Sequence, residues 1–316
     1  MKTSAALTAF FFAKDFTPYT RRGYERSLTA FFSWAETHTC ELHPQPVCDV
    51  EDVDKRHFNE FLARLRVTPS VATGKLLTGQ TLHGYARVIK AFLNWCIKDD
   101  MLPERVTKKL DMPKKEVRVI PVFTPTQVNQ LFKACERPGD IQYPWIAERD
   151  KAIVAILLDT GIRQAELCGL TLDRVRLDKQ DSYIIVFGKG RKEREIGLGQ
   201  ASRQQLPRYI HRFRPHAPGV NHVFLTRDRR PLAAHGLEAV MLRLKTITGI
   251  TGMRCSCHDF RHTFAYNYLA NGGDLFKLSR LLGHTDIATT QGYLRAFQSR
   301  DARKGFSVLD KMREQR

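Results

Sequence analysis

No stretch of this 316-residue chain approaches the roughly 20 apolar residues that a helix needs to cross a bilayer. The apolar run from Ala5 to Ala13 has about the length of a signal-peptide core, but it lacks a small-residue cleavage site and ends among aromatic residues. The sequence therefore predicts an amphipathic helix at this place, no membrane partner and a cytoplasmic protein.

The regular cysteine spacing of a disulfide framework is also lacking. Seven cysteines lie at irregular intervals, and their odd number leaves at least one unpaired, which favours a reducing compartment. Cys255, Cys257 and His258 form a cluster of metal-ligand residue types. A structural zinc site, however, usually has a wider C-x2-C pair and a second pair elsewhere. We expect neither a metal nor another cofactor.

Acidic residues are scarce relative to basic ones. The chain has 33 Asp and Glu against 51 Lys and Arg, which gives a net charge of +18. Residues 1–122 contain 19 basic and 14 acidic residues, net +5, and residues 123–316 contain 32 and 19, net +13. Such a balance indicates a polyanionic partner, of which nucleic acid is the commonest. We expect both halves to contact the phosphates of a nucleic acid; a soluble basic protein without such a partner is the alternative.

Residues 1–112 contain only helical patterns. Pro18 stands where a helix can begin, Asp54 can cap a second helix, and a third is predicted from about Thr81 to Ile97. Three or four short helices can form a compact bundle, so the sequence predicts a helical first domain.

A basic, proline-containing stretch at 113–122 has the composition of an exposed linker. It either follows a DNA backbone or is a solvated connector.

Residues 123–316 indicate a second, mainly helical domain with a small β-hairpin, so that the whole chain is mainly α with a small sheet (α+β). Thr124 to Gln127 has the pattern of a capping box. A helix over 148–159 ends at Gly161, and Arg163 follows on the first turn of a short helix. Residues 182–187 pair with 195–198, around a tip that carries three cations. Further helices are predicted at about 200–212, 235–248, 258–270, 274–282 and 286–295.

Six polar residues of this second domain are candidates for chemistry: Arg163, Lys189, His258, Arg261, His284 and Tyr293. His258 and Arg261 are three positions apart and share a helix face. A guanidinium beside an imidazole is suited to holding a phosphate and moving a proton near it. His262 points about 100° away from Arg261 and is interpreted as a packed or surface histidine. Glu166 is interpreted as structural support that braces Arg163 or another helix.

Five separated motifs in this region resemble those of the tyrosine recombinases, or phage-type integrases. They are Thr160-Gly-Ile-Arg-Gln-Ala-Glu-Leu167, Gly188-Lys-Gly190, His258-Asp-Phe-Arg-His-Thr-Phe264, Leu281-Leu-Gly-His284 and Tyr293. Their order and residue types match over roughly residues 123–297. The resemblance implies a site-specific recombinase or integrase that cleaves and rejoins double-stranded DNA through a 3′-phosphotyrosyl intermediate, without metal or ATP. It also implies that the protein is associated with the nucleoid.

The resemblance also implies a role for each residue. Tyr293 is the nucleophile, Arg163, Arg261 and His284 bind the phosphate oxygens, and His258 accepts the proton of the nucleophile. Lys189 is favoured as the general acid, with Lys192 as the alternative.

The remaining parts are interpreted through the same family. Residues 1–112 correspond to its core-binding domain, and no additional N-terminal arm-binding domain is evident. A tail helix is expected from the apolar spacing of Phe306, Val308, Leu309 and Met312. The resemblance implies that this tail docks on a neighbour in a homotetramer on DNA formed from free monomers; docking on its own domain is the alternative. Rival functions are a type IB topoisomerase-like relaxation of DNA and a non-cleaving DNA-binding protein.

Overall fold

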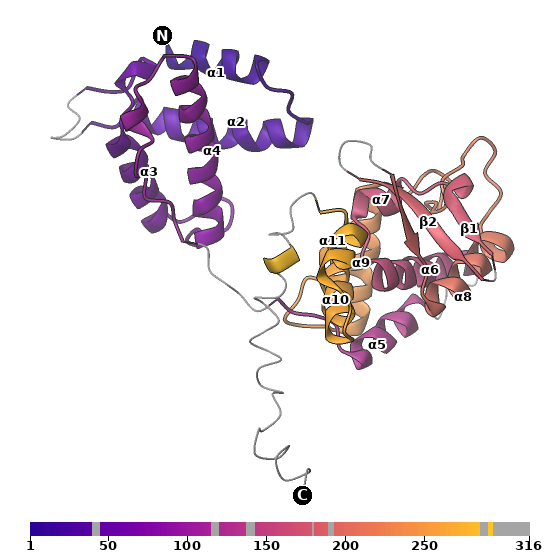
Figure 1. The fold of residues 1–316 in the computed structure, drawn as a ribbon. Helices are drawn as coiled ribbons and strands as arrows, with labels where there is room; N and C mark the ends of the chain where they lie inside the picture. The colour runs from indigo at the N-terminus through magenta and orange to yellow at the C-terminus, as the bar shows by residue number, and fades with distance from the viewer. Residues whose placement is uncertain are drawn as a thin grey trace, which may run out of the picture. The chain divides into compact units, whose positions relative to one another are not determined.

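The computed structural model describes residues 1–39, 45–114, 120–136, 143–178, 180–188, 193–284 and 290–292. The chain divides into two compact units, Met1–Val117 and Arg118–Arg316, and each has its own buried core (Figure 1). The linker at 113–122 stays a prediction, because residues 115–119 lie outside the described part.

The first unit is a bundle of four helices. They are α1 (Thr3–Phe12), α2 (Pro18–Ala35), α3 (Lys55–Val67) and α4 (Gly79–Lys98), with short 3₁₀ turns at Val50–Asp52 and Glu104–Val106. Helix α2 starts at Pro18 as predicted, and the Asp54 carboxylate accepts backbone N–H bonds at the start of α3. Phenylalanines from α1 to α4 fill the core, including Phe10, Phe31, Phe58 and Phe92.

Helix α1 confirms the predicted helix near the N-terminus but not its amphipathic character. Ala6 and Phe10 are buried, whereas Phe12 is 94% exposed. Apolar side chains therefore lie on more than one face of this helix.

The second unit is built around α6 (Pro144–Thr160), which lies in its middle and contacts α5 (Pro125–Cys135), α8 (Gln200–Arg208) and α10 (Cys257–Ala270) (Figure 1). Short helix α7 (Gln164–Cys168) contacts α9 (Ala234–Thr248), and α11 (Leu275–Leu282) contacts α10. The capping box of α5 is present: the backbone N–H groups of Thr124 and Gln127 donate to each other's side-chain oxygens at 2.9 and 3.2 Å.

A three-stranded antiparallel sheet with the order β1-β2-β3 accompanies these helices. Strands β2 (Ser182–Phe187) and β3 (Glu193–Gly197) form the predicted hairpin, with Ile184 opposite Ile196. Strand β1 (Val175–Leu177) was not predicted, because three residues are too few to show an alternating pattern. The predicted fold class, mainly helical with a small sheet, is confirmed.

One predicted helix ends early and another falls mostly outside the described residues. Helix α8 ends at Arg208 and gives way to a π-helical turn, Tyr209–Phe213. Pro207 lies beside this change, and its missing N–H interrupts the α-helical bonding. Of the helix predicted at 286–295, only the helical residues 290–292 are described. Within the described ranges, no helix has the length and apolar character that crossing a membrane requires.

Candidate active site

A tight turn after α6 positions Arg163. Gly161 has φ +59°, and a Cβ there would lie 2.5 Å from the Phe264 ring, so glycine meets both the backbone and the space requirement. Arg163 then caps α7, and its backbone N–H donates to Oε2 of Glu166 at 2.8 Å. The turn therefore fixes where the Arg163 side chain leaves the backbone.

Helix α10 supplies His258 and Arg261. Its start is held by Asp259, whose Oδ2 accepts from the backbone N–H of Ser256 at 2.7 Å and from its hydroxyl at 2.8 Å. His258 lies exposed on the first turn, and Arg261, one turn later, is only 4% exposed. Arg261 donates from Nη1 to the carbonyl of Gly161 at 2.9 Å, which ties α10 to the turn that carries Arg163.

Three arginines meet the last carbonyls of α11. Arg194 Nε donates to Leu281 O at 2.9 Å, Arg261 Nη2 to Leu282 O at 2.7 Å, and Arg163 Nη2 to Gly283 O at 2.8 Å. The last carbonyls of a helix have no partner within it and carry partial negative charge, so cations are favoured there. The three guanidinium groups therefore converge on one helix end.

His284 follows directly on this helix end. Its Nε2 lies 2.8 Å from Arg261 Nη2, which can only donate, so Nε2 accepts and the proton is assigned to Nδ1. Nδ1 lies 2.7 Å from the hydroxyl of Thr290. Burial lowers the pKa of His284 to about 4, and the charges of Arg261, Arg163 and Arg194 act in the same direction. The imidazole is therefore neutral at neutral pH.

Glu166 joins two of these arginines. Its Oε1 accepts from Nη1 of Arg163 at 2.9 Å and from Nη1 of Arg194 at 2.8 Å, while Oε2 accepts from Nη2 of Arg194 at 2.8 Å. Burial raises the pKa of Glu166, but the hydrogen bonds and charges of Arg194 and Arg163 outweigh it, and the net pKa lies below its usual value. Glu166 is thus an ionised bridge, consistent with its interpretation as support.

His258 is packed against His262, the next residue on its helix face. The two ring centroids are 4.0 Å apart in an edge-to-face arrangement. His258 as a whole is exposed, but neighbouring side chains shield its ring in part from water; this shielding and, secondarily, the charge of Arg261 lower its pKa. Burial and His258 lower the pKa of His262 to about 4. The interpretation of His262 as a packed histidine agrees with this contact. The lowered pKa of His258 favours its neutral form, the form that can accept a proton.

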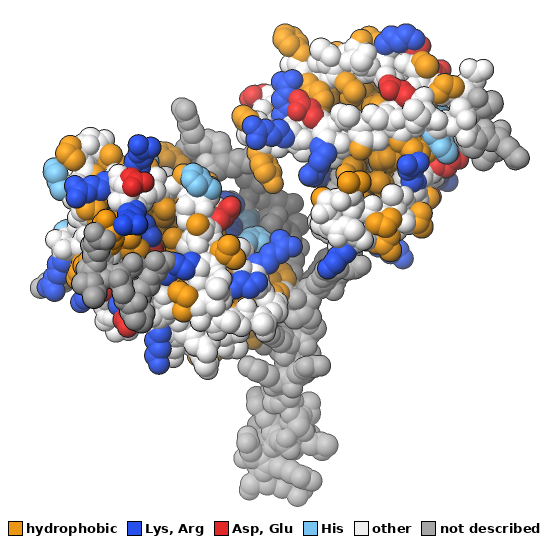
Figure 2. All heavy atoms as spheres, turned by 180° about the vertical axis from the view of Figure 1, so that it is seen from behind, with side chains coloured by type: hydrophobic (Ala, Val, Ile, Leu, Met, Phe, Trp, Pro, Cys, Tyr) orange, Lys and Arg blue, Asp and Glu red, His pale blue; other side chains and the backbone are white. Residues whose placement is uncertain are grey.

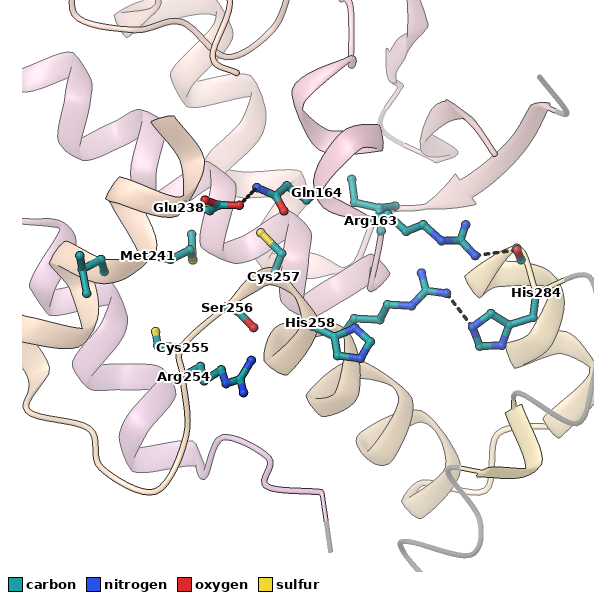
Figure 3. A pocket seen from close by; sticks show the side chains of 14 residues that line it. Arg163, Gln164, Glu238, Met241, Arg254, Cys255, Ser256, Cys257, His258 and His284 are labelled. Carbon is teal, nitrogen blue, oxygen red and sulfur yellow. Dashed lines mark hydrogen bonds between the residues drawn. The ribbon is translucent and has the colours of Figure 1, made fainter. Parts of the chain in front are cut away.

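A pocket of about 690 Å³ contains these groups (Figure 3). It is lined by Ile162, Arg163, Gln164, Glu238, Met241, Leu242, Arg254, Cys255, Ser256, Cys257, His258, Arg261, Gly283 and His284. In Figure 3 the rings of His258 and His284 lie on the same side as the Arg163 guanidinium, and Glu238 and Met241 line another part.

Basic side chains are more numerous than acidic ones on the face of the protein seen in Figure 2.

Four of the six candidate residues thus line one pocket: Arg163, His258, Arg261 and His284. Lys189, its alternative Lys192, and Tyr293 lie outside the described residues. Sequence reasoning missed Arg194, because it stands among the charged residues of the hairpin with nothing to distinguish it.

The cysteines beside His258 are thiols rather than thiolates. Burial raises the pKa of Cys255 to about 11 and that of Cys257 to about 12. In the described ranges, no group of three or more His, Cys, Asp or Glu residues is arranged to hold a metal ion.

Residues 121–300, more than half of the chain, match the model of the phage integrase family. The chain belongs to this family. The resemblance to tyrosine recombinases is thereby confirmed, and site-specific DNA recombination by an enzyme is the activity of the family.

Relatives of this integrase-family protein include bacterial tyrosine recombinases named XerC. That of Pseudomonas syringae pv. tomato is 29% identical over 284 residues, which cover 89% of this chain and 86% of the relative. That of Bacillus licheniformis is 28% identical over 285 residues, with the same shares covered.

Solved structures show the same fold. The XerH site-specific recombinase bound to a palindromic difH substrate has a TM-score of 0.70 at 16% identity, covering 91% of this chain and 80% of that one. The Tn1549 transposon integrase in complex with a circular intermediate DNA has a TM-score of 0.69 at 19% identity, covering 96% of this chain and 100% of that one.

Proposed function

We propose that this integrase-family protein cleaves and rejoins DNA strands through a 3′-phosphotyrosyl link to Tyr293. The observation that carries the proposal is the convergence of Arg163, Arg261 and His284 at one pocket, which His258 also lines. These are the groups that a phosphoryl transfer without a metal requires: fixed cations, a hydrogen-bond donor and a base.

The first requirement is to stabilise the charge of the pentacovalent phosphate. A guanidinium offers parallel N–H groups that match two phosphate oxygens, which a lysine amine does poorly. Arg163 and Arg261 each donate some of their N–H groups to the protein and are thereby held in place before DNA binds. We assign both to the non-bridging oxygens. His284 is assigned to a further hydrogen bond there, for which its single proton has to move from Nδ1 to Nε2 when a phosphate oxygen replaces Arg261 as the partner of Nε2.

The reaction then needs two proton transfers. The Tyr293 hydroxyl attacks phosphorus and gives its proton to His258, whose lowered pKa leaves the imidazole free to accept it. A new bond joins the tyrosine oxygen to phosphorus, and the bond from phosphorus to the 5′-oxygen breaks. The departing oxygen takes a proton from Lys189, with Lys192 as the alternative. Attack of a 5′-hydroxyl on the phosphotyrosine reverses these steps, so bond energy is conserved without ATP.

The assembly is the second part of the proposal. Residues 1–112 form the core-binding domain, 113–122 the linker and 123–316 the catalytic domain with its tail helix. Both domains contact phosphates, since both halves carry net positive charge. Free monomers assemble into a tetramer on two duplexes, held by the tail at 306–312, which lies outside the described residues. The protein acts in the cytoplasm on nucleoid DNA.

The test is to map covalent adducts on the DNA that flanks the gene, and then to compare the wild type with Tyr293→Phe on a nicked duplex carrying the mapped site. A nick beside the scissile bond lets the cleaved strand diffuse away and traps the intermediate. Tyr293→Phe is expected to bind DNA normally and form no adduct. An adduct of wild-type yield in this variant contradicts the assignment of Tyr293.

Strand exchange separates recombination from its rivals. Two duplexes with the mapped site are expected to give joined products. Relaxation of supercoiled plasmid without such products indicates a topoisomerase-like enzyme, and binding without any adduct indicates a DNA-binding protein that does not cleave.

A further inference from the structure

We propose that Arg194 is a positioning residue that fixes Arg163 and the segment before His284 in the geometry needed for cleavage. The inference rests on the proposed function, because it assigns a role within the same site. Arg194 lies on β3, the strand that follows the hairpin tip.

The first observation is that the Arg194 side chain is largely buried and bonded to the protein. Its side chain is 13% exposed, and that of its partner Glu166 is 3% exposed. Two parallel N–H groups of Arg194 reach the two oxygens of Glu166, each at 2.8 Å. This fork-to-carboxylate geometry is the strongest form of such a pair. Unlike Arg163 and Arg261, Arg194 is not among the residues that line the pocket, so we assign it to positioning rather than to DNA.

The second observation is that both carboxylate oxygens of Glu166 also accept hydrogen bonds from Arg163. Oε1 also accepts from the Arg163 side chain at 2.9 Å, and Oε2 from the Arg163 backbone N–H at 2.8 Å. Both oxygens are therefore shared between the two arginines. The position of Arg194 thus determines that of the carboxylate, and the carboxylate determines that of the Arg163 guanidinium.

The third observation is that Arg194 holds the opposite wall of the site as well. Its Nε donates to Leu281 O at 2.9 Å, on the helix end whose next carbonyls are bound by Arg261 and Arg163. A Cβ added at Gly283 would lie 2.9 Å from Nη1 of Arg194, so the guanidinium packs closely on the backbone just before His284. One side chain thus joins β3, α7 and the end of α11.

Arg194→Lys removes the fork and keeps the charge. An amine is a single point of attachment and cannot reach both Glu166 oxygens and the Leu281 carbonyl in this geometry. We expect the Arg163 guanidinium to lose its alignment with the phosphate. A displacement of about 1 Å at a reacting centre costs about 100-fold in rate.

The assay uses two versions of the nicked duplex with the mapped site. One has an ordinary scissile phosphodiester; in the other a methylphosphonate replaces one charged non-bridging oxygen by a neutral methyl group. The neutral linkage needs less cationic stabilisation, so Arg163→Ala is expected to be impaired much less on it than on the phosphodiester. Single-turnover cleavage is measured on both, and the ratio of the two rates is compared among variants.

Arg194→Lys is expected to cleave the phosphodiester about 100-fold more slowly than the wild type. On the methylphosphonate its rate should stay within about 10-fold of the wild type, a difference of about 1.4 kcal/mol in barrier. DNA affinity should be unchanged.

The matched control is Arg214→Lys. Arg214 donates to the carbonyls of Val220, His222 and Val223 at 2.8 to 3.2 Å, and none of these residues lines the pocket. This control should lose thermal stability but keep the wild-type ratio of rates.

A folded Arg194→Lys protein that cleaves both linkages at wild-type rates, or loses the same factor on both, overturns the inference. If Arg163→Ala shows the selective loss and Arg194→Lys does not, only the role of Arg194 fails. If the wild type forms no adduct on either linkage, the proposed function fails, and the inference fails with it.

Discussion

Replacing Glu166 by glutamine tests whether the bridge between Arg163 and Arg194 stabilises the fold and the reaction together. The new amide would retain one oxygen but present an N–H donor to a guanidinium that can only donate. The charge between the two arginines would also be lost. Breaking a buried ion pair costs about 3–5 kcal/mol. The side chain of Arg163 is 37% exposed, so solvent screens part of this cost, and we expect a loss of about 2–3 kcal/mol.

The expected loss can be measured by thermal unfolding. For a domain of this size, 1 kcal/mol corresponds to about 2–4 °C, so the midpoint of the second unit should fall by about 4–12 °C. Cleavage of the nicked duplex at a temperature where the variant is folded should fall by about 10-fold or more, because either the Arg163 backbone N–H or its side chain loses its acceptor.

The pH dependence of the effect has a definite sign. The pKa of Glu166 is lowered in the folded protein, because the bonds from Arg194 and Arg163 outweigh burial. Its contribution to stability is therefore fully present above the unfolded pKa of about 4.3 and is lost as the pH falls through the folded pKa. The difference in unfolding free energy between wild type and Glu166→Gln should accordingly narrow below about pH 4.

Glu148→Gln provides the control. Glu148 lies on α6 and is also buried. Its carboxylate accepts from Arg208 at 2.6 Å and from Lys151 at 3.3 Å. It should lose stability while the cleavage rate per folded molecule stays at the wild-type value. Wild-type stability and cleavage in Glu166→Gln, or an equal loss of cleavage in Glu148→Gln, would refute the reasoning.

Further outcomes are expected from single changes elsewhere. Lys189→Ala should regain cleavage when sulfur replaces the scissile 5′-bridging oxygen, because a thiolate leaves without a proton; no regain in the cleavage assay argues against a general acid here. Gly283→Ala should lose about 1–2 kcal/mol in denaturant unfolding, because alanine is strained at φ +62°. Because the pKa of His284 is lowered in the folded protein, the unfolded protein binds this proton more readily. The free energy of unfolding of the wild type should therefore fall as the pH drops below about 6.5, and that of His284→Gln should fall less steeply. Truncation after Phe297 should abolish tetramers on DNA in sedimentation; intact tetramers would favour a tail that docks on its own domain. Raising the salt concentration should weaken DNA binding steeply, and an isolated first domain that does not bind DNA at low salt would contradict the proposal of two binding domains.

Local signals in the sequence predicted the elements that carry the site. The capping pattern at Thr124, the stop at Gly161 and the three-residue spacing of His258 and Arg261 depend on neighbours along the chain, so they are visible without a structure. The hairpin was visible for the same reason, since its first strand is rich in β-branched and aromatic residues and a glycine-containing tip separates it from the second.

The contacts that hold the site together join residues far apart in the chain. Arg194 and Glu166 are 28 positions apart, and Arg163 and Gly283 are 120 apart. No periodicity relates such pairs, and an arginine that binds a carbonyl looks in sequence like one that faces solvent. This is why Arg194 was not singled out, whereas Glu166, only three positions from Arg163, was interpreted as a brace for Arg163 or another helix. The short strand β1 was missed because its pairing partner, rather than its own composition, makes it a strand.

The contacts at the end of α11 restrict the insertions and deletions that this helix can tolerate. Adding or removing one residue within that helix turns everything beyond it by about 100° and shifts it by about 1.5 Å. Carbonyls 281, 282 and 283 would then face away from their three arginines, and His284 would leave the pocket in the same step. Insertions and deletions should therefore be tolerated in connecting loops of this protein family long before they are tolerated in this helix of only eight residues.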